Sequence, residues 1–316
     1  MSRALFFLGE LSRRLWLRAA ILGVFAVLAV LAAHGLAAFA PEAAAARVSE
    51  ETTTELLKIM ASSMLAVATF SLATFVAAAG AVLTNTSPRA AALVLDDRSA
   101  HNALSSFIGA FIFSVVALIA VGTGFYTPEG RFVLFLITLA VLGLVVVLLL
   151  RWIDQLSKIG RVSHVIDRVE RATEQALKSR QPFLGGAPPE PAPAGAPPVT
   201  AHRVGYVQHV DVARLDAVAR GYGVRAHLAV LPGAFVRLTR PVLFLEGAAG
   251  PPDDKLLSAL RGCVVIGDDR TFQQDPRFGL VVLAEIAARA LSPAVNDPGT
   301  AIDVVGRAVR LFSTWG

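Results

Sequence analysis

The chain has 316 residues, of which 55% are hydrophobic, and its formal net charge at pH 7 is +5. A mean hydropathy of +0.61 is too high for an ordinary soluble domain. The basic residues are not interleaved with aromatic ones, which argues against nucleic acid as a partner. Because Cys263 is the single cysteine, an intrachain disulfide and a thiolate metal cluster are excluded.

Four long apolar stretches without a central charge occupy the first half of the chain. A hydrocarbon core about 30 Å thick requires about 20 residues of helix at about 1.5 Å per residue. Each stretch is long enough to cross such a core, so we predict four transmembrane helices. They cover about Leu15–Ala40, Ile59–Leu83, Leu104–Tyr126 and Phe132–Leu150.

A secretory signal peptide is the alternative interpretation of the first stretch. Residues Ala38 to Ala40 resemble a cleavage site of the small-x-small type. The apolar part is longer than the roughly 7–15 residues of a signal peptide, however, and Pro41 follows the would-be cleavage site. A retained helix is therefore the preferred interpretation.

The positive charges around the four stretches predict their orientation. With the N-terminus inside, 11 Lys and Arg residues flank the inner ends and 3 flank the outer ends. Inner loops of membrane proteins carry the excess of Lys and Arg, so we predict that both termini lie in the cytoplasm. The inner residues are Arg3, Arg13, Arg14, Arg18, Arg89, Arg98, Arg151, Lys158, Arg161, Arg168 and Arg171, and the outer ones are Arg47, Lys58 and Arg131.

Small and hydroxyl-bearing side chains distinguish the second stretch. They fall near one stripe of the predicted helix: Ser62, Ala66, Thr69, Ala73, Gly80 and Thr84. Close packing of helices is the commoner reason for such a stripe. The sharper hypothesis is a pore wall built from several copies, where small side chains leave room and hydroxyls tune wetting. No ionisable residue lies near the middle of the stretches, and His34, toward the outer end of the first, is the only candidate, which argues against a proton-coupled transporter.

A short helix is predicted between the second and third stretches. It begins at Ser87-Pro88, because serine can cap a helix and proline suits its first position. Asp96 and Asp97 follow near its end; such a pair can bind a cation but is more typical of a solvated surface.

The helix of the fourth stretch is predicted to continue into the cytoplasm through residues 153–182. Apolar or small residues recur there at spacings of three and four, from Ile159 to Ala176. This seam suggests a stalk that packs on a neighbouring copy or on the loop helix. The predicted organisation is therefore a four-helix transmembrane domain over residues 1–152, a juxtamembrane helix over 153–182, a Pro-rich linker over 183–199 and a small cytoplasmic α+β domain over 200–316.

Two helices are predicted near the C-terminus, and each begins at an Asp-Pro pair. Asp275 and Asp297 are natural N-caps, Pro276 and Pro298 suit the first helical position, and Asn296 precedes the second pair. A helix N-terminus can hold an anion, but an aspartate cap satisfies the same N–H groups, so capping is preferred over ligand binding. The chain has no Gly-rich phosphate loop, paired-His metal spacing or nucleophile elbow, which predicts a protein that is not an enzyme and takes no cofactor or metal.

Several segments resemble a large family of bacterial predicted inner-membrane proteins of unknown function. The matching pieces are ASSML, SPR, GYVQHVDVARL, PGAFV and above all QDPRFGLVVLAEIAARALSPAVNDPGTAID. The resemblance covers nearly the whole chain and implies a four-span N-terminal part followed by a cytoplasmic domain. It implies no activity, catalytic residue or cofactor.

The leading functional hypothesis is a homo-oligomeric, channel-like integral membrane protein, ion-conducting along the second stretch and assembled or gated by its cytoplasmic domain. The alternative is a membrane-anchored sensor or scaffold whose cytoplasmic domain binds a protein or small ligand. The expected partners are the lipid bilayer and further copies of the chain; the permeant ion or ligand is left open. An intramembrane enzyme is the least favoured class, since the stretches hold no acidic pair, metal triad or Ser–Lys arrangement.

Overall fold

The computed structural model describes residues 15–41, 45, 47–95, 98–159, 161–180, 191–247 and 252–314. Within these residues the chain divides into two compact units. The helical unit contains residues up to Thr84 and Val94–Arg161. The C-terminal unit contains Asn85–Leu93 and the residues from Val162 onward.

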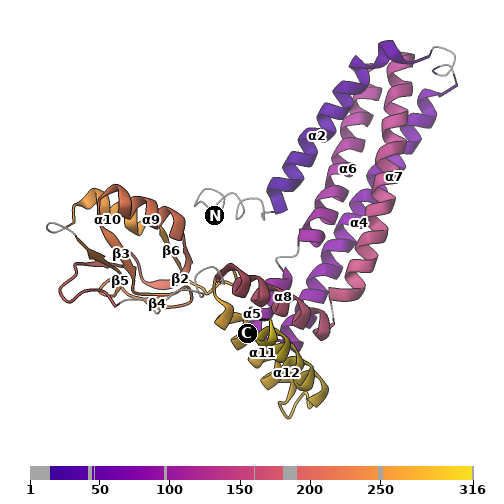
Figure 1. Ribbon diagram of the computed structural model, residues 1–316. Coiled ribbons are helices and arrows are strands. Elements are labelled where there is room, and N and C mark those ends of the chain that lie inside the picture. Colours follow the sequence, from indigo (N-terminus) through magenta and orange to yellow (C-terminus); the bar gives the residue numbers. More distant parts are fainter. Residues whose placement is uncertain are drawn as a thin grey trace. The chain divides into compact units, whose positions relative to one another are not determined.

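Four long helices build the helical unit (Figure 1). Their sequences are rich in Ala, Leu and Val and contain no proline beyond the first position, so nothing interrupts the backbone hydrogen bonds. A short 3₁₀ helix, η1 (Ala37–Phe39), follows the first of them. The long helices are α2 (Leu15–Gly35), α4 (Glu50–Asn85), α6 (Arg98–Gly122) and α7 (Pro128–Ile159).

Three of these helices are long and apolar enough to cross a membrane, over Glu50–Thr84, Asn102–Gly122 and Pro128–Lys158. In α2 the apolar helix found among the described residues is Ala20–Gly35, which is shorter than a full span. The prediction of four spans is therefore confirmed for three and not for the first. The α-helix itself ends at Gly35, before the predicted end at Ala40.

The helices α2, α6 and α7 pack closely on one another. A Cβ atom at Gly109 of α6 would lie 2.9 Å from Cβ of Leu22, so glycine is what permits the close approach of α2. Near the other end of α6, the Tyr126 hydroxyl donates a 2.6 Å hydrogen bond to the carbonyl oxygen of Val30. This bond satisfies a buried polar group and fixes α2 against the connection between α6 and α7.

The helix predicted to continue from the fourth stretch through residues 153–182 is broken. Helix α7 ends at Ile159, and a separate helix, α8, spans Val162–Arg180. The sequence places Gly160 at the break, and glycine is a poor helix former. Of the predicted seam, Ile166, Val169, Thr173 and Ala176 are buried, and α8 packs on two helices near the C-terminus of the same chain, α11 (Pro276–Ala290) and α12 (Pro298–Ser313).

The rest of the C-terminal unit is built from short strands and two helices. Two three-stranded antiparallel sheets have the orders β1-β5-β3 and β4-β2-β6. Helices α9 (Val212–Gly221) and α10 (Asp254–Arg261) cover one side of the strands (Figure 1). The strands are β1 (Pro198–Thr200), β2 (Gly205–Val210), β3 (Arg225–Leu228), β4 (Phe235–Val236), β5 (Pro241–Glu246) and β6 (Val264–Gly267).

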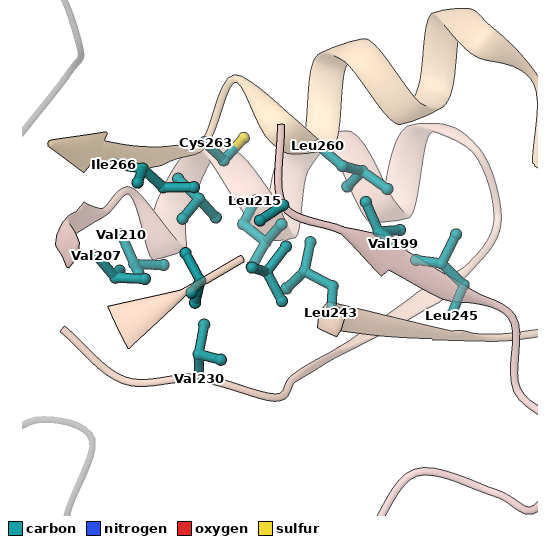
Figure 2. Close-up of a cluster of buried hydrophobic side chains, with 14 of the residues drawn as sticks. Val199, Val207, Val210, Leu215, Val230, Leu243, Leu245, Leu260, Cys263 and Ile266 are labelled. Atoms are coloured by element: carbon teal, nitrogen blue, oxygen red, sulfur yellow. The ribbon is translucent and has the colours of Figure 1, made fainter. Parts of the chain in front are cut away.

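The core of this α+β part consists of side chains that converge from both sheets and both helices (Figure 2). Leu243 and Leu260 are fully buried in it, and Cys263 belongs to the same core with only 1% of the residue exposed. Asp211 caps α9 and Asp253 caps α10, each accepting a backbone N–H hydrogen bond. These local signals place both helices against the strands.

Some sequence predictions fall on residues that the structure does not describe. Asp96 and Asp97 lie outside the described residues, and so do residues 183–190 of the predicted linker. At its other end the predicted linker runs into β1, which begins at Pro198. The short helix after Ser87 is confirmed as α5 (Pro88–Leu95), because the Ser87 hydroxyl accepts a hydrogen bond of 3.2 Å from the backbone N–H of Ala90.

Candidate functional surfaces

The stripe of small residues on α4 faces away from the other helices of its unit. All six members are exposed: Ser62, Ala66, Thr69, Ala73, Gly80 and Thr84. A Cβ atom at Gly80 would meet no atom within 4 Å. Small side chains normally serve close helix contacts, but here no described helix of the same chain uses them.

The opposite face of α4 holds this helix against its unit through larger side chains. Leu57 and Met60 are almost completely buried, and Met64 packs with Phe107 of α6 and Trp152 of α7. The backbones of α6 and α7 lie further from the backbone of α4 than the backbones of α2, α6 and α7 lie from one another. Helix α4 is therefore held by a face that includes Leu57, Met60 and Met64 together with smaller buried residues, while the stripe lies on its exposed face, beside exposed large apolar residues such as Phe70.

The hydroxyl groups on the outer face of α4 are satisfied within their own helix. Thr69 donates to the carbonyl oxygens of Leu65 and Ala66, and Thr84 donates to those of Gly80 and Ala81, at distances of 2.9–3.3 Å. The stripe therefore needs no water to satisfy its hydroxyl protons, while the oxygen lone pairs remain available to a facing partner. This chemistry suits a helix interface and the wall of a narrow conduit alike.

At its last residue, Asn85, helix α4 is followed almost directly by α5, which is fixed within the C-terminal unit. Ala90 and Ala91 of α5 are fully buried. Arg89 forms an ion pair with Glu285 of α11. A displacement of α11 would thus act on a segment that is joined covalently to the end of α4.

Asp275 links the first Asp-Pro motif to its surroundings. Its side chain is 3% exposed and accepts hydrogen bonds from the Phe278 backbone N–H at 3.2 Å and from Arg270 Nε at 2.9 Å. Pro276 takes the first position of α11. The guanidinium of Arg270 also lies over the ring of Phe278, 4.9 Å from its centroid. This carboxylate is thus both a helix cap and half of a buried ion pair.

Two further cations lie near this carboxylate. Burial lowers the pKa of the Arg180 guanidinium at the end of α8, the neighbouring Arg277 lowers it further, and Asp275 opposes both effects. Positive charge therefore exceeds negative charge around the N-terminus of α11. Asp275 keeps this concentration of charge tolerable.

The same motif connects α11 to the strands. The backbone N–H of Val210, at the end of β2, donates a 2.8 Å hydrogen bond to the Gln274 side chain, which returns a bond of 3.3 Å to the Val210 carbonyl. The turn at Gly233 packs so tightly on Asp275 that a Cβ atom would lie 2.0 Å from the carboxylate. On the far side, Gly279 meets Thr173 of α8 in an equally close contact. Each of these residues joins two elements of the unit.

The second Asp-Pro motif has different surroundings. Asn296, Asp297 and Pro298 are all exposed, and Asn296 adopts the left-handed conformation with φ of 49°. Asp297 caps α12 by accepting from the N–H of Thr300 at 3.1 Å and from its hydroxyl at 2.6 Å. These bonds, from the hydroxyl first, lower the pKa of Asp297. Two motifs alike in sequence are therefore buried in one case and exposed in the other.

A charged network joins α8 to α12. Glu170 accepts hydrogen bonds from Arg307 at 2.7 Å and from Arg310 at 2.8 Å. Arg307 also pairs with Asp167 and Asp303. Burial raises the pKa of Glu170, but the two arginines outweigh it and hold that pKa below its usual value. Hydrogen bonding to Glu170 likewise raises the pKa of Arg310.

We expect Glu170→Gln to weaken the α8–α12 contact by about 2 kcal/mol, because it removes the charge from two hydrogen bonds to arginine. A carboxylate whose pKa is lowered on folding stabilises the fold above its unfolded pKa, and this contribution disappears as the pH falls through the folded pKa. The variant should therefore lose stability at pH 7 and lose part of the acid dependence of the parent. Urea unfolding followed by far-UV circular dichroism of the detergent-solubilised chain between pH 7 and pH 3 measures both effects.

The matched control is Glu174→Gln on the same helix. Glu174 pairs with Lys178, whose side chain is 66% exposed, so its loss should change stability by less than about 0.5 kcal/mol. Equal effects of the two substitutions at pH 7 would contradict the role assigned to Glu170.

Sequence analysis did not identify the partners of these motif residues. Arg270 lies five residues before Asp275, Gly233 is 42 positions away, and Thr173 belongs to a helix that precedes the strands. Among the described residues, no group of three or more His, Cys, Asp or Glu side chains is arranged to hold a metal ion.

Comparison with known proteins adds a family and distant relatives. Residues 12–316 match the family model described as "Predicted membrane protein (DUF2254)". Uncharacterized proteins of Mycobacterium bovis (Mb1321c) and Mycobacterium tuberculosis (Rv1290c) are each 42% identical over 121 residues, which is 37% of this chain and 23% of each relative. The chain thus matches less than a quarter of the length of these relatives. No solved structure matches it.

Proposed function

The chain belongs to the DUF2254 family of predicted membrane proteins, and from this premise we propose that it is a homo-oligomeric, channel-like protein of the bacterial inner membrane. In this proposal the outer faces of α4 from several copies surround a common axis. Both termini lie in the cytoplasm, and the C-terminal unit assembles or gates the conduit without acting as an enzyme or taking a cofactor.

One observation carries the proposal: a stripe of small and hydroxyl-bearing residues lies on the exposed face of α4, and no described helix of the same chain packs on it. A helix that met only lipid would have no need of such a stripe, since lipid tails accommodate large apolar side chains on any face. Leu65, Leu72 and Val76 are exposed beside the stripe and supply such lipid-compatible surface. A second copy of α4 or a narrow conduit accounts for the stripe itself.

The connection through α5 supports a gating role for the C-terminal unit. The Arg89–Glu285 ion pair and the buried alanines of α5 attach the end of α4 to α11. In the proposal, rearrangement of α11 is transmitted to α4 by this attachment, which is a mechanical linkage rather than a chemical step.

Conductance measurements with substituted α4 helices test the proposal. The purified full chain in planar bilayers should carry current, and Ala73→Phe should reduce the single-channel current by at least about half, because the added ring narrows the conduit. Leu72→Phe is the matched control: it adds bulk to the neighbouring exposed residue outside the stripe and should leave the current unchanged.

Cysteine crosslinking tests the oligomer independently of the current. Thr69→Cys in the stripe should form disulfide-linked dimers in membranes, whereas the parent chain should not, since its single thiol, Cys263, is buried. Failure to observe current under voltage, tension or ligand, together with tolerance of both phenylalanine substitutions, would instead favour the membrane-anchored sensor or scaffold. A reporter fused after Gly316 that is active only in the periplasm would overturn the orientation.

A further inference from the structure

The end of helix α8 brings an arginine to the beginning of helix α11. Thr173 of α8 packs on Gly279 of α11 so closely that a Cβ atom on the glycine would have no room. Arg180 lies seven residues after Thr173, which is two turns further along the same face of α8. Arg277 lies two residues before Gly279, in the first turn of α11. Since the charges of Arg277 and Asp275 both act on Arg180, the two arginines lie at the same end of the α8–α11 contact.

The carboxylate beside the two arginines already has partners. The oxygens of Asp275 accept from Arg270 Nε at 2.9 Å and from the Phe278 backbone N–H at 3.2 Å. Among the residues that the structure describes, no acceptor forms a hydrogen bond or ion pair with the guanidinium of Arg180 or Arg277. Two positive charges therefore remain without a bonded counterion.

Burial makes the missing counterion costly at Arg180. Removal from water lowers the pKa of its guanidinium, and the like charge of Arg277 lowers that pKa further. The N-terminus of the 15-residue helix α11 adds the positive end of its dipole at the same place. A cation that is partly removed from water and surrounded by positive charge stabilises the fold only when an anion joins it. Arg277 is exposed, so an anion can reach this place from solvent.

A phosphoryl group matches these two arginines in shape and in charge. Each guanidinium presents a planar fork of N–H donors, and phosphate oxygens accept two such bonds in parallel. One phosphoryl group has enough oxygens for two guanidinium groups, and a phosphate dianion carries the negative charge that compensates both. A single carboxylate offers only two oxygens and one charge, which leaves the second arginine uncompensated. Helix N-termini also bind phosphate through their free N–H groups.

We propose that Arg180 and Arg277 bind a phosphoryl group between the end of α8 and the beginning of α11. The group comes from an anionic phospholipid headgroup or from a phosphate-bearing solute, which share this chemistry. The site goes beyond the proposed conduit, because binding requires neither an oligomer nor a current. It gives the C-terminal unit a ligand that ties α8 to α11, and α11 in turn holds α5 through the Arg89–Glu285 ion pair.

Chemical modification of arginine tests the site in the full chain. Phenylglyoxal reacts with accessible guanidinium groups, and mass spectrometry of the peptides reports each arginine separately. In maltoside detergent, inorganic phosphate at about 10 mM should slow the modification of Arg180 and Arg277 by about fivefold or more relative to chloride at equal ionic strength, because a bound ligand blocks them by mass action. Arg289, exposed near the other end of α11, is the internal control and should slow by less than about twofold. Equal slowing of all three arginines, or of none, would overturn the proposal.

Substitution tests whether the two arginines bind one anion together. Arg277→Gln should abolish the protection of Arg180 by phosphate, and Arg289→Gln should preserve it. The reciprocal variant, Arg180→Gln, gives the same test with the reaction of Arg277 as its measurement. Labelling of the buried Cys263 thiol as slow as in the parent chain checks that each variant is folded. Full protection of the remaining arginine in either folded variant would overturn the shared site.

Nanodiscs of two compositions distinguish the sources of the phosphoryl group. The bilayers contain phosphatidylcholine alone or mixed with phosphatidylglycerol, and no free phosphate is present at first. Slower modification of Arg180 in the anionic nanodiscs identifies a lipid headgroup as the ligand, and protection only after inorganic phosphate is added identifies a solute. Absence of protection under every condition would overturn the proposal, whereas the conductance and Thr69→Cys crosslinking experiments decide the conduit independently.

Discussion

Replacing Asp275 with alanine should lower the stability of the C-terminal unit by about 3–4 kcal/mol, the sum of a lost helix cap and a broken buried ion pair. The substitution leaves Arg270 without its carboxylate partner and removes the negative charge that offsets burial at Arg180. Asp297→Ala, in the sequence-related motif, should cost only about 1 kcal/mol, because Asp297 is exposed and serves as a cap alone.

The buried thiol of Cys263 offers a direct measurement of this difference in the full chain. Cys263 lies in the core of the α+β part, so a thiol reagent reaches it only when that part opens. A loss of about 3 kcal/mol corresponds to labelling faster by about two orders of magnitude, since each 1.4 kcal/mol is a factor of ten. Equal labelling rates in the two alanine variants would refute the distinction between the buried and the exposed motif.

Gly233→Ala should be destabilising by about 3 kcal/mol. Gly233 has a φ of 90°, a conformation that costs an alanine about 1–2 kcal/mol, and the new Cβ would lie 2.0 Å from Asp275 Oδ2. The carboxylate cannot withdraw without losing Arg270 and the cap of α11. The steric and conformational penalties therefore add, and Cys263 labelling should be faster by roughly a hundredfold.

Gly247→Ala separates the two penalties. Gly247 has nearly the same backbone conformation, with φ of 82°, but the nearest atom to its Cβ would be 3.7 Å away. Its substitution should cost only the backbone share, about 1–2 kcal/mol. If both variants were equally stable, the close contact between Gly233 and Asp275 would have no energetic consequence, and the link between the strands and α11 would need another explanation.

These predictions concern the joint between the strands and the helices α8, α11 and α12. Gln274, Asp275 and Gly279 are consecutive or nearly so in sequence, yet they contact β2, the Gly233 turn and α8 respectively. A single short segment thus ties together three elements of the C-terminal unit. Through Glu285, further along α11, the same helix also holds α5.

Local features of the sequence were sufficient to predict most of the helices and the residues at which they begin. The apolar lengths predicted α4, α6 and α7. The hydroxyl or carboxylate before Pro88, Pro276 and Pro298 predicted helix starts, because a cap bonds to a backbone N–H only two or three residues away. The periodic seam of α8 predicted its buried residues for the same reason. Interactions confined to one turn of a helix can be predicted from residues that are adjacent in the sequence.

Where each surface lies required the tertiary structure. The stripe on α4 was visible as a pattern, but only the packing of Leu57, Met60 and Met64 decides that the stripe faces outward. The seam of α8 was visible too, but its partners were not, because Arg307 and Arg310 follow more than 130 residues later. The break after Ile159 was missed since the seam runs across it at helical spacing.

The two Asp-Pro motifs show most clearly which properties follow from the local sequence and which depend on tertiary packing. Composition, spacing and proline position make Asp275 and Asp297 equivalent, and each caps the helix that follows it. Burial then separates them: Asp275 meets Arg270 and the Gly233 turn, whereas Asp297 remains in solvent. The sequence by itself determined the apolar spans and the helix starts, since these depend on the chemistry of adjacent residues. Only the tertiary structure decided which of those residues are buried, because burial depends on segments that are distant along the chain.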